Sequence, residues 1–111
     1  MRSWRVLVVL VAALCACGDD ADPTCRTSPL TYQTAGQPYI ENWCRGCHGA
    51  DVPITMRQRA PLGMNFDTLA EVRAQLVPIA TTTANATMPP QGGPSDGERA
   101  MMLQWLRCGA P

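Results

Sequence analysis

Apolar residues recur at helical spacing in three stretches of the chain, and segments rich in proline or glycine separate these stretches. The first stretch carries four apolar residues at positions i, i+3, i+4 and i+7 of one helix face: Ile40, Trp43, Cys44 and Cys47. Pro38 suits the first turn of a helix, because an N–H at that position has no partner within the helix. The pattern predicts a helix that begins at 37–38 and ends near Gly49, since glycine is a typical residue at a helix C-terminus.

The second stretch has an apolar stripe formed by Leu69, Val72 and Leu76. This stripe predicts a helix over Thr68–Leu76, with Asn65 or Asp67 as its N-cap. Pro78 should end or kink this helix, because proline lacks the N–H that a helix interior needs. We expect a further short helical turn over Pro78–Ala84.

The third stretch lies at the C-terminal end of the sequence. Ser95 and Glu98 have the spacing of a capping box, in which each side chain bonds the backbone N–H of the other residue. The helix that follows is predicted to run to about Arg107. Its buried face has four members: Met101, Met102, Trp105 and Leu106. We expect this helix to cross the first one near Trp105, in an all-α fold of three to four helices.

Two segments show no clear periodicity, namely Thr27–Thr34 and Gly49–Asn65. The former is a polar lead-in to the first helix. The latter holds two prolines and two arginines: Pro53, Arg57, Arg59 and Pro61. A long irregular stretch in a small domain is usually functional or disordered. We predict a solvated surface position for both arginines, with a contact to a propionate group of a bound cofactor as the alternative.

The N-terminal residues are typical of an export signal. A basic start is followed by the apolar run Val6–Ala13, which is too short to span a membrane. Leu14-Cys15-Ala16 before Cys17 resembles the lipobox of bacterial lipoproteins, which implies cleavage after residue 16 and acylation of Cys17. Acylation of Cys15 instead, and an ordinary signal peptide without a lipid, are the alternatives.

This interpretation divides the chain into three parts. Residues 1–16 form a signal peptide, residues 17–37 form a flexible tether and lead-in, and residues 38–111 form one domain. Removal of 16 of the 111 residues leaves 95, for which an apolar core alone gives marginal stability. Two of the nine arginines leave with the signal, so seven basic residues remain against nine acidic ones, and the chain has no lysine. The absence of a basic patch argues against nucleic acid as a partner.

The five residues Cys44-Arg45-Gly46-Cys47-His48 match the C-x-x-C-H signature of c-type haem attachment. In such a motif, the two thiols form thioethers with the two vinyl groups of one porphyrin, and the imidazole ligates the iron. Three other interpretations are open: a thioredoxin-like redox pair, a zinc site that uses Cys44, Cys47, His48 and one more cysteine, and ordinary thiols beside a surface histidine. His48 is the only histidine of the chain, and no βαβ pattern is visible, so the haem interpretation is preferred.

Two further cysteines, Cys25 and Cys108, lie near opposite ends of the predicted domain. In an oxidising compartment the simplest prediction for such a pair is a disulfide. Closing so long a loop would stabilise the fold by about 4 kcal/mol in the chain-entropy model. The alternative is two free thiols.

Met88 is the candidate for the second axial ligand of the iron. It precedes two prolines, and Pro89 directs the residue before it into an extended conformation. A stiff loop that presents a thioether suits an electron carrier, and thioether ligation raises the reduction potential. Met64 is the main rival, and Met56, Met101 and Met102 are the others. A sixth position that is empty or holds water is also an open alternative.

The order of these features resembles the class I cytochrome c domain, in particular small exported bacterial lipoproteins that end in a Trp-Leu-x-Cys-Gly-Ala-Pro tail, here Trp105–Pro111. The resemblance covers residues 38–111. It implies a cytochrome c-like fold around one covalently bound haem c, with His48 and Met88 as axial iron ligands. The chain lacks a Gly-Pro directly after the motif, so the backbone partner of His48 is left open, with Pro53 and Pro61 marking the candidate segments.

The resemblance implies an electron-transfer protein of the periplasm, held on a membrane by its lipid and otherwise soluble. We expect a monomer that exchanges electrons with redox partner proteins and is not an enzyme, because no catalytic constellation is visible. The alternative is a haem-based enzyme or small-ligand sensor in which the sixth ligand is displaced.

Overall fold

The structure is a computed structural model, and it describes residues 22–111. The predicted signal peptide and the predicted acylation site Cys17 lie outside the described residues. Within residues 22–111 the fold is all-α, because helices and turns account for the regular structure and no strand occurs there. In the same part of the chain, no helix is long and apolar enough to cross a membrane.

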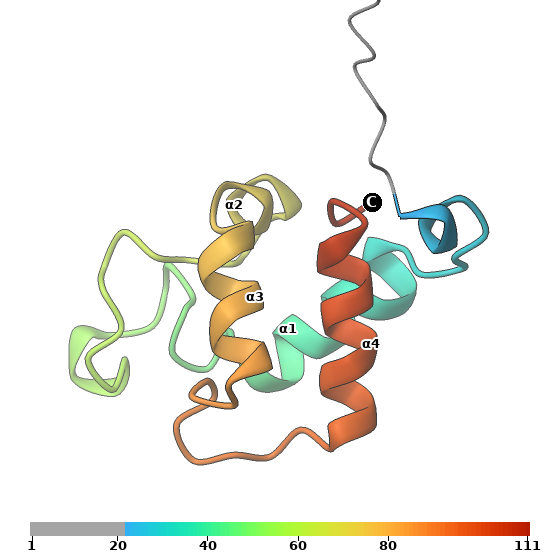
Figure 1. Ribbon diagram of the computed structural model, residues 1–111. Helices are drawn as coiled ribbons and strands as arrows, with labels where there is room; N and C mark the ends of the chain where they lie inside the picture. Colours follow the sequence, from blue (N-terminus) through green and yellow to red (C-terminus); the bar gives the residue numbers. More distant parts are fainter. Residues whose placement is uncertain (1–21) are drawn as a thin grey trace, which may run out of the picture.

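Four α-helices and three short helical segments follow one another along the described chain (Figure 1). In order they are η1 (Pro23–Arg26), η2 (Tyr32–Gly36), α1 (Gln37–Trp43), η3 (Ile54–Met56), α2 (Leu69–Ala74), α3 (Leu76–Ala84) and α4 (Asp96–Arg107). Helices α3 and α4 lie side by side, and α1 runs behind them. The segment between α1 and α2 forms a wide loop on one side of these helices.

The first helical segment begins earlier than the sequence predicts and ends earlier as well. The π-helix η2 leads directly into α1, so the continuous helical segment before the cysteine motif begins at Tyr32 rather than at 37–38. Thr31 and Thr34 form a reciprocal capping box, in which each hydroxyl accepts the other residue's backbone N–H. Helix α1 ends at Trp43, and hydrogen-bonded turns then carry the chain from Cys44 onward. The cysteines therefore follow the helix instead of lying within it.

The second predicted helix corresponds to α2, and the further turn predicted over Pro78–Ala84 belongs to α3, which already begins at Leu76. The predicted caps of the second helix are wrong. Thr68 caps α2, because its hydroxyl accepts the N–H of Glu71 at 3.2 Å. Asp67 instead binds Arg45 and the backbone N–H of Ala50, which draws this segment toward the cysteine motif. Pro78 lies in the first turn of α3, where its missing N–H costs no helical hydrogen bond.

Helix α4 matches its prediction at both ends. The capping box of Ser95 and Glu98 is present, with distances of 2.7 and 3.1 Å, and the helix ends at Arg107. The hydrogen bonds from Ser95 lower the pKa of the Glu98 carboxyl. The core has ten members: Ala35, Tyr39, Ile40, Phe66, Val72, Ile79, Met102, Trp105, Leu106 and Ala110.

Trp105 is the centre of the contact between η2 and α4. Its side chain is completely buried, it stacks on Tyr32, and its Nε1 donates to the backbone oxygen of Pro111 at 3.0 Å. The same oxygen accepts the N–H of Tyr32 at 2.7 Å. Gly36 lies against the indole ring, so that a Cβ built on Gly36 would overlap this ring. The close approach of the two segments therefore requires glycine at position 36.

Substitution Gly36→Ala is expected to lower the free energy of unfolding by about 1–3 kcal/mol, because the added methyl group must displace a fully buried indole. The urea midpoint of unfolding measures this effect. Gly63→Ala is the matched control, because a Cβ at position 63 meets no atom within 4 Å. Equal midpoints for the two variants would show that the contact with Trp105 tolerates a side chain.

A disulfide joins Cys25 of η1 to Cys108 at the C-cap of α4, with a Cα–Cα distance of 5.3 Å. Loss of this bond through the double substitution Cys25→Ser and Cys108→Ser is expected to lower the free energy of unfolding by about 4 kcal/mol, because the bond closes a loop across a sequence separation of 83. Chemical unfolding with and without reductant measures the effect. Reductant should lower the midpoint of the unaltered chain and leave the double variant unchanged; an unaltered chain that is insensitive to reductant contradicts the prediction.

Candidate functional site

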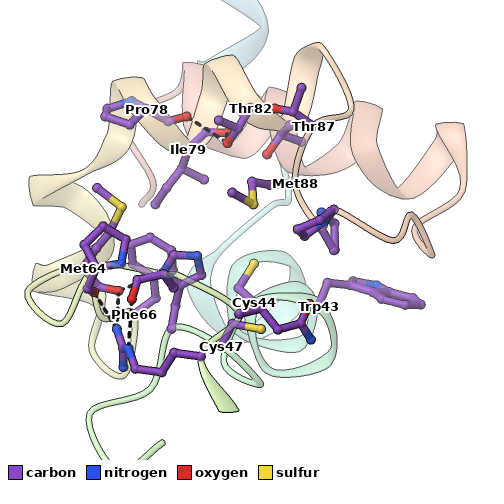
Figure 2. Close-up of a pocket in the computed structure, with 18 of the residues that line it drawn as sticks. Trp43, Cys44, Cys47, Met64, Phe66, Pro78, Ile79, Thr82, Thr87 and Met88 are labelled. Carbon is purple, nitrogen blue, oxygen red and sulfur yellow. Dashed lines mark hydrogen bonds between the residues drawn. The ribbon is translucent and has the colours of Figure 1, made fainter. Parts of the chain in front are cut away.

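A cavity of about 400 Å³ lies between α1, α3 and the two long loops. Its volume is within the range of small-molecule and cofactor sites, and its walls are mainly apolar. The four residues that the sequence analysis selected as haem ligands all line it: Cys44, Cys47, His48 and Met88. Figure 2 shows Met88 on one side of the cavity and the two cysteines on the opposite side.

The two thiols reach the cavity from the turns that follow α1. The carbonyl of Cys44 accepts the N–H groups of both Cys47 and His48, at 3.1 and 2.9 Å. These bonds form one tight turn. The turn brings the side chains of Cys44, Cys47 and His48 to the same wall of the cavity. Both thiols are free, and burial raises the pKa of the Cys44 thiol to about 12. Cys44 therefore stays protonated at neutral pH.

His48 makes three contacts with the segment Met64–Phe66. Its side chain is buried, its ring stacks on the ring of Phe66 at a centroid distance of 4.6 Å, and its carbonyl accepts the N–H of Phe66 at 2.7 Å. Nδ1 lies 2.8 Å from the carbonyl oxygen of Met64. Because a carbonyl only accepts, Nδ1 carries the proton and Nε2 keeps its lone pair for a ligand. Of the two candidate segments, the acceptor lies in the one that Pro61 marks, because Met64 closes a hydrogen-bonded turn with Pro61, and it is not the carbonyl of either proline.

Met88 lies in the loop between α3 and α4, and its backbone is fixed at both ends. Its N–H donates to the carbonyl of Thr82 at 3.3 Å, and its carbonyl accepts from Nη1 of Arg99 at 2.9 Å. Arg99 belongs to α4, so the long closing helix holds the loop in place. The side chain is directed toward the cavity in Figure 2, with 41% of the residue surface exposed.

The other methionines are placed less well to act opposite His48. Met102 is completely buried in the core, and Met56 is 64% exposed and does not line the cavity. Met64 lines the cavity, but its carbonyl bonds His48, which places its backbone on the histidine side. A ligand opposite His48 has to approach from the other side, where Met88 lies.

Two residues that line the cavity each have a buried polar atom without a hydrogen bond within residues 22–111. Tyr39 Oη and Trp43 Nε1 are buried without a hydrogen bond, although both residues line the cavity. Burial raises the pKa of the Tyr39 hydroxyl, so it stays neutral at physiological pH. Buried donors normally find acceptors in native structures.

The described residues do not assemble a zinc site. A tetrahedral site would need a fourth ligand besides Cys44, Cys47 and His48, and Cys25 and Cys108 are joined to each other. Within residues 22–111 no group of three or more histidine, cysteine or acidic side chains is close enough to hold a metal ion. Instead, two thiols, an imidazole and a thioether lie apart from one another in the walls of a cavity that is much larger than a metal ion.

The prediction of a solvated position for Arg57 is wrong. Both arginines line the cavity, but Arg57 is 1% exposed, whereas Arg59 is exposed as predicted. The sequence carries no local signal for this burial, because the acceptors of Arg57 are backbone carbonyls of a loop without periodicity.

Comparison with family models, with curated proteins and with solved structures finds no match to this chain. The site therefore has to be interpreted from its own residues and geometry.

Proposed function

We propose that the chain is a monohaem cytochrome c that transfers electrons. One observation carries this proposal: the two thiols, the imidazole and the thioether that a c-type haem with His/Met ligation uses converge on one mainly apolar cavity, although Met88 is distant in sequence from the other three residues. Cys44 and Cys47 would hold the porphyrin through thioethers, and His48 Nε2 and Met88 Sδ would bind the iron from opposite sides. The finer description of the fold, a cytochrome c-like domain, is part of this proposal.

When bound, haem supplies a one-electron couple between ferrous and ferric iron. The chain's own residues then have three tasks. The thiols fix the group in place, the mainly apolar walls keep water from it, and the two axial residues are held by the hydrogen bonds of their own backbone or ring. Ligands fixed in this way favour electron transfer, because their positions change little when the iron gains or loses an electron.

A second candidate function is a haem-based sensor or enzyme in which a small ligand displaces Met88. The observation that favours it is the wall beside Met88, where the three threonines Thr82, Thr83 and Thr87 line the cavity. The hydroxyl groups of Thr82 and Thr87 already donate to Pro78 O and Asn85 Oδ1, at 2.9 and 2.6 Å, so their oxygens could only accept a hydrogen bond from a polar ligand at the iron. The partial exposure of Met88 is also compatible with its displacement.

The remaining parts of the proposal concern the setting of the protein. Export through the N-terminal signal and acylation of Cys17 would place the domain on the periplasmic side of a bacterial membrane. There it would act as a monomer, would not be an enzyme, and would exchange electrons with protein partners. Membrane partition of a Cys17→Ala variant tests the lipid: if the variant still partitions with membranes, the lipid anchor is wrong.

The test of the proposed function is the optical spectrum and the intact mass of the domain, expressed in a periplasm that attaches c-type haem. We expect a mass increase of one haem and low-spin spectra in both oxidation states. A high-spin spectrum of the unaltered protein would favour the sensor or enzyme. A protein without covalent haem would contradict both candidates.

A further inference from the structure

Arg57 is a buried cation whose partners are all backbone carbonyls. Its guanidinium donates to Gly49 O at 2.6 Å, Pro61 O at 2.7 Å, Ala60 O at 3.3 Å and Met64 O at 3.3 Å. No carboxylate takes part, and within residues 22–111 the ion pair that occurs joins Arg45 to Asp67 instead. Burial of an unpaired charge is costly. The cost of this burial indicates that the guanidinium and its four hydrogen bonds have a role that a neutral side chain would not fill.

The carbonyls that Arg57 binds come from the two ends of the loop around His48. Gly49 follows His48 directly, and Pro61 and Met64 belong to the returning segment. Between Arg57 and this segment, Gln58 and Arg59 have φ values of 49° and 70°, a conformation that disfavours most side chains. The large apolar side chains of this loop, Ile54, Met56 and Leu62, are mainly exposed, so polar contacts hold the ends of the loop together. The guanidinium supplies four of these contacts.

One of these acceptors is shared with the histidine. Met64 O accepts from Nδ1 of His48 at 2.8 Å and from Nη2 of Arg57 at 3.3 Å. A carbonyl oxygen has two lone pairs and can serve both donors. The position of this oxygen decides the strength of the hydrogen bond to His48, and this bond in turn sets the orientation of the ring and its strength as a ligand.

We infer that Arg57 is a positioning residue of the site: its guanidinium ties Met64 to Gly49 and so holds the Met64 carbonyl on Nδ1 of His48. This inference rests on the proposed function, because it concerns the ligand strength of His48 toward haem iron. Arg57 itself touches no ligand atom of His48 and acts through the Met64 carbonyl.

Two substitutions separate the geometry of Arg57 from its charge. Arg57→Lys keeps the charge but loses the planar set of donors, and Arg57→Gln also removes the charge. In both variants of the haem-loaded protein, the His48 Nδ1 proton, observed by NMR, should exchange with solvent about tenfold faster. Arg73→Gln is the matched control: it removes a guanidinium that donates to the Ala110 carbonyl at 3.0 Å, away from the cavity.

The reduction potential provides a second readout with a defined sign. A weaker hydrogen bond at Nδ1 makes His48 a poorer donor, and this destabilises ferric iron more than ferrous iron. Arg57→Lys should therefore raise the ratio of ferrous to ferric protein about tenfold at a fixed solution potential, which is about 59 mV for a one-electron couple. The reduction potential of Arg57→Gln should be lower than that of Arg57→Lys, because loss of the positive charge favours the ferric state. Arg73→Gln should keep the potential of the unaltered protein.

Three results would overturn the inference while leaving the proposed function intact. The first is covalent low-spin haem with unchanged Nδ1 exchange in both Arg57 variants. The second is an acceleration equal to that of the α4 backbone amides, which would indicate general destabilisation. The third needs no variant: in the unaltered protein, the Nε proton of Arg57 should exchange at least tenfold more slowly than that of the exposed Arg107, and equal rates contradict the inference. Absence of covalent haem from the unaltered protein would instead overturn the proposed function.

Discussion

A chain in which Cys44 and Cys47 are both replaced by alanine is expected to contain no covalent haem. The attachment adds the S–H of each thiol across one vinyl group, so that a sulfur–carbon bond forms, the hydrogen goes to the other vinyl carbon and no oxidant is consumed. When both sulfur atoms are absent, no such bond can form. The measurement is the intact mass together with extraction in acidified organic solvent, which removes haem that is not covalently bound.

The single variants should differ from the double variant in a graded way. Cys44→Ala and Cys47→Ala each leave one thiol on the cavity wall, so each is expected to keep one thioether and to show a vinyl-type shift in its reduced spectrum. The matched control replaces the other cysteine pair, Cys25 and Cys108, which form the disulfide away from the cavity. This control should lose stability and keep its haem. Covalent haem in the Cys44/Cys47 double variant would show that the cavity does not serve the proposed function.

The parts of the fold that the sequence predicted correctly are those that local interactions decide. The capping box of Ser95 and Glu98 involves residues three positions apart, and the apolar spacing of α4 repeats within single turns. The start of η2 at Tyr32 is not evident from the sequence, because Thr31 and Thr34 form their box without the glutamate or glutamine of the usual pattern. The cap of the second helix was misplaced, because Asp67 has a better partner in the distant Arg45.

In the candidate site too, the residues that a local pattern indicates were predicted, and those that depend on distant contacts were not. Cys44, Cys47 and His48 are contiguous, so a short motif indicates them, and Met88 is marked by the prolines after it. The residues that hold these groups in place were not predictable. The acceptor of His48 is a backbone oxygen, which every residue has, and the roles of Arg57 and Arg99 depend on which distant carbonyls reach them. Sequence patterns identify side-chain chemistry, whereas positioning depends on the tertiary path of the backbone.

Substitution Met88→Ala is expected to produce the largest change in redox behaviour. Thioether ligation stabilises ferrous iron, and axial ligands set haem potentials over a range of about 0.8 V, so its loss should lower the reduction potential by a substantial part of that range. The oxidised protein should also lose the far-red sulfur-to-iron band and become high-spin or bind water. Spectra in both oxidation states and a redox titration measure these effects.

Two other methionines separate ligation from the general effect of losing a thioether. Met64→Leu removes the rival sulfur and keeps the Met64 carbonyl on His48, so the far-red band should persist. Met56→Ala removes an exposed methionine that does not line the cavity and should leave both the band and the potential unchanged. A band that survives in Met88→Ala and disappears in Met64→Leu would transfer the ligand role to Met64. Because the Met64 carbonyl bonds His48, that result would require the loop of residues 57–64 to reorganise when haem binds, and Arg57 would then lose the contacts that keep it buried.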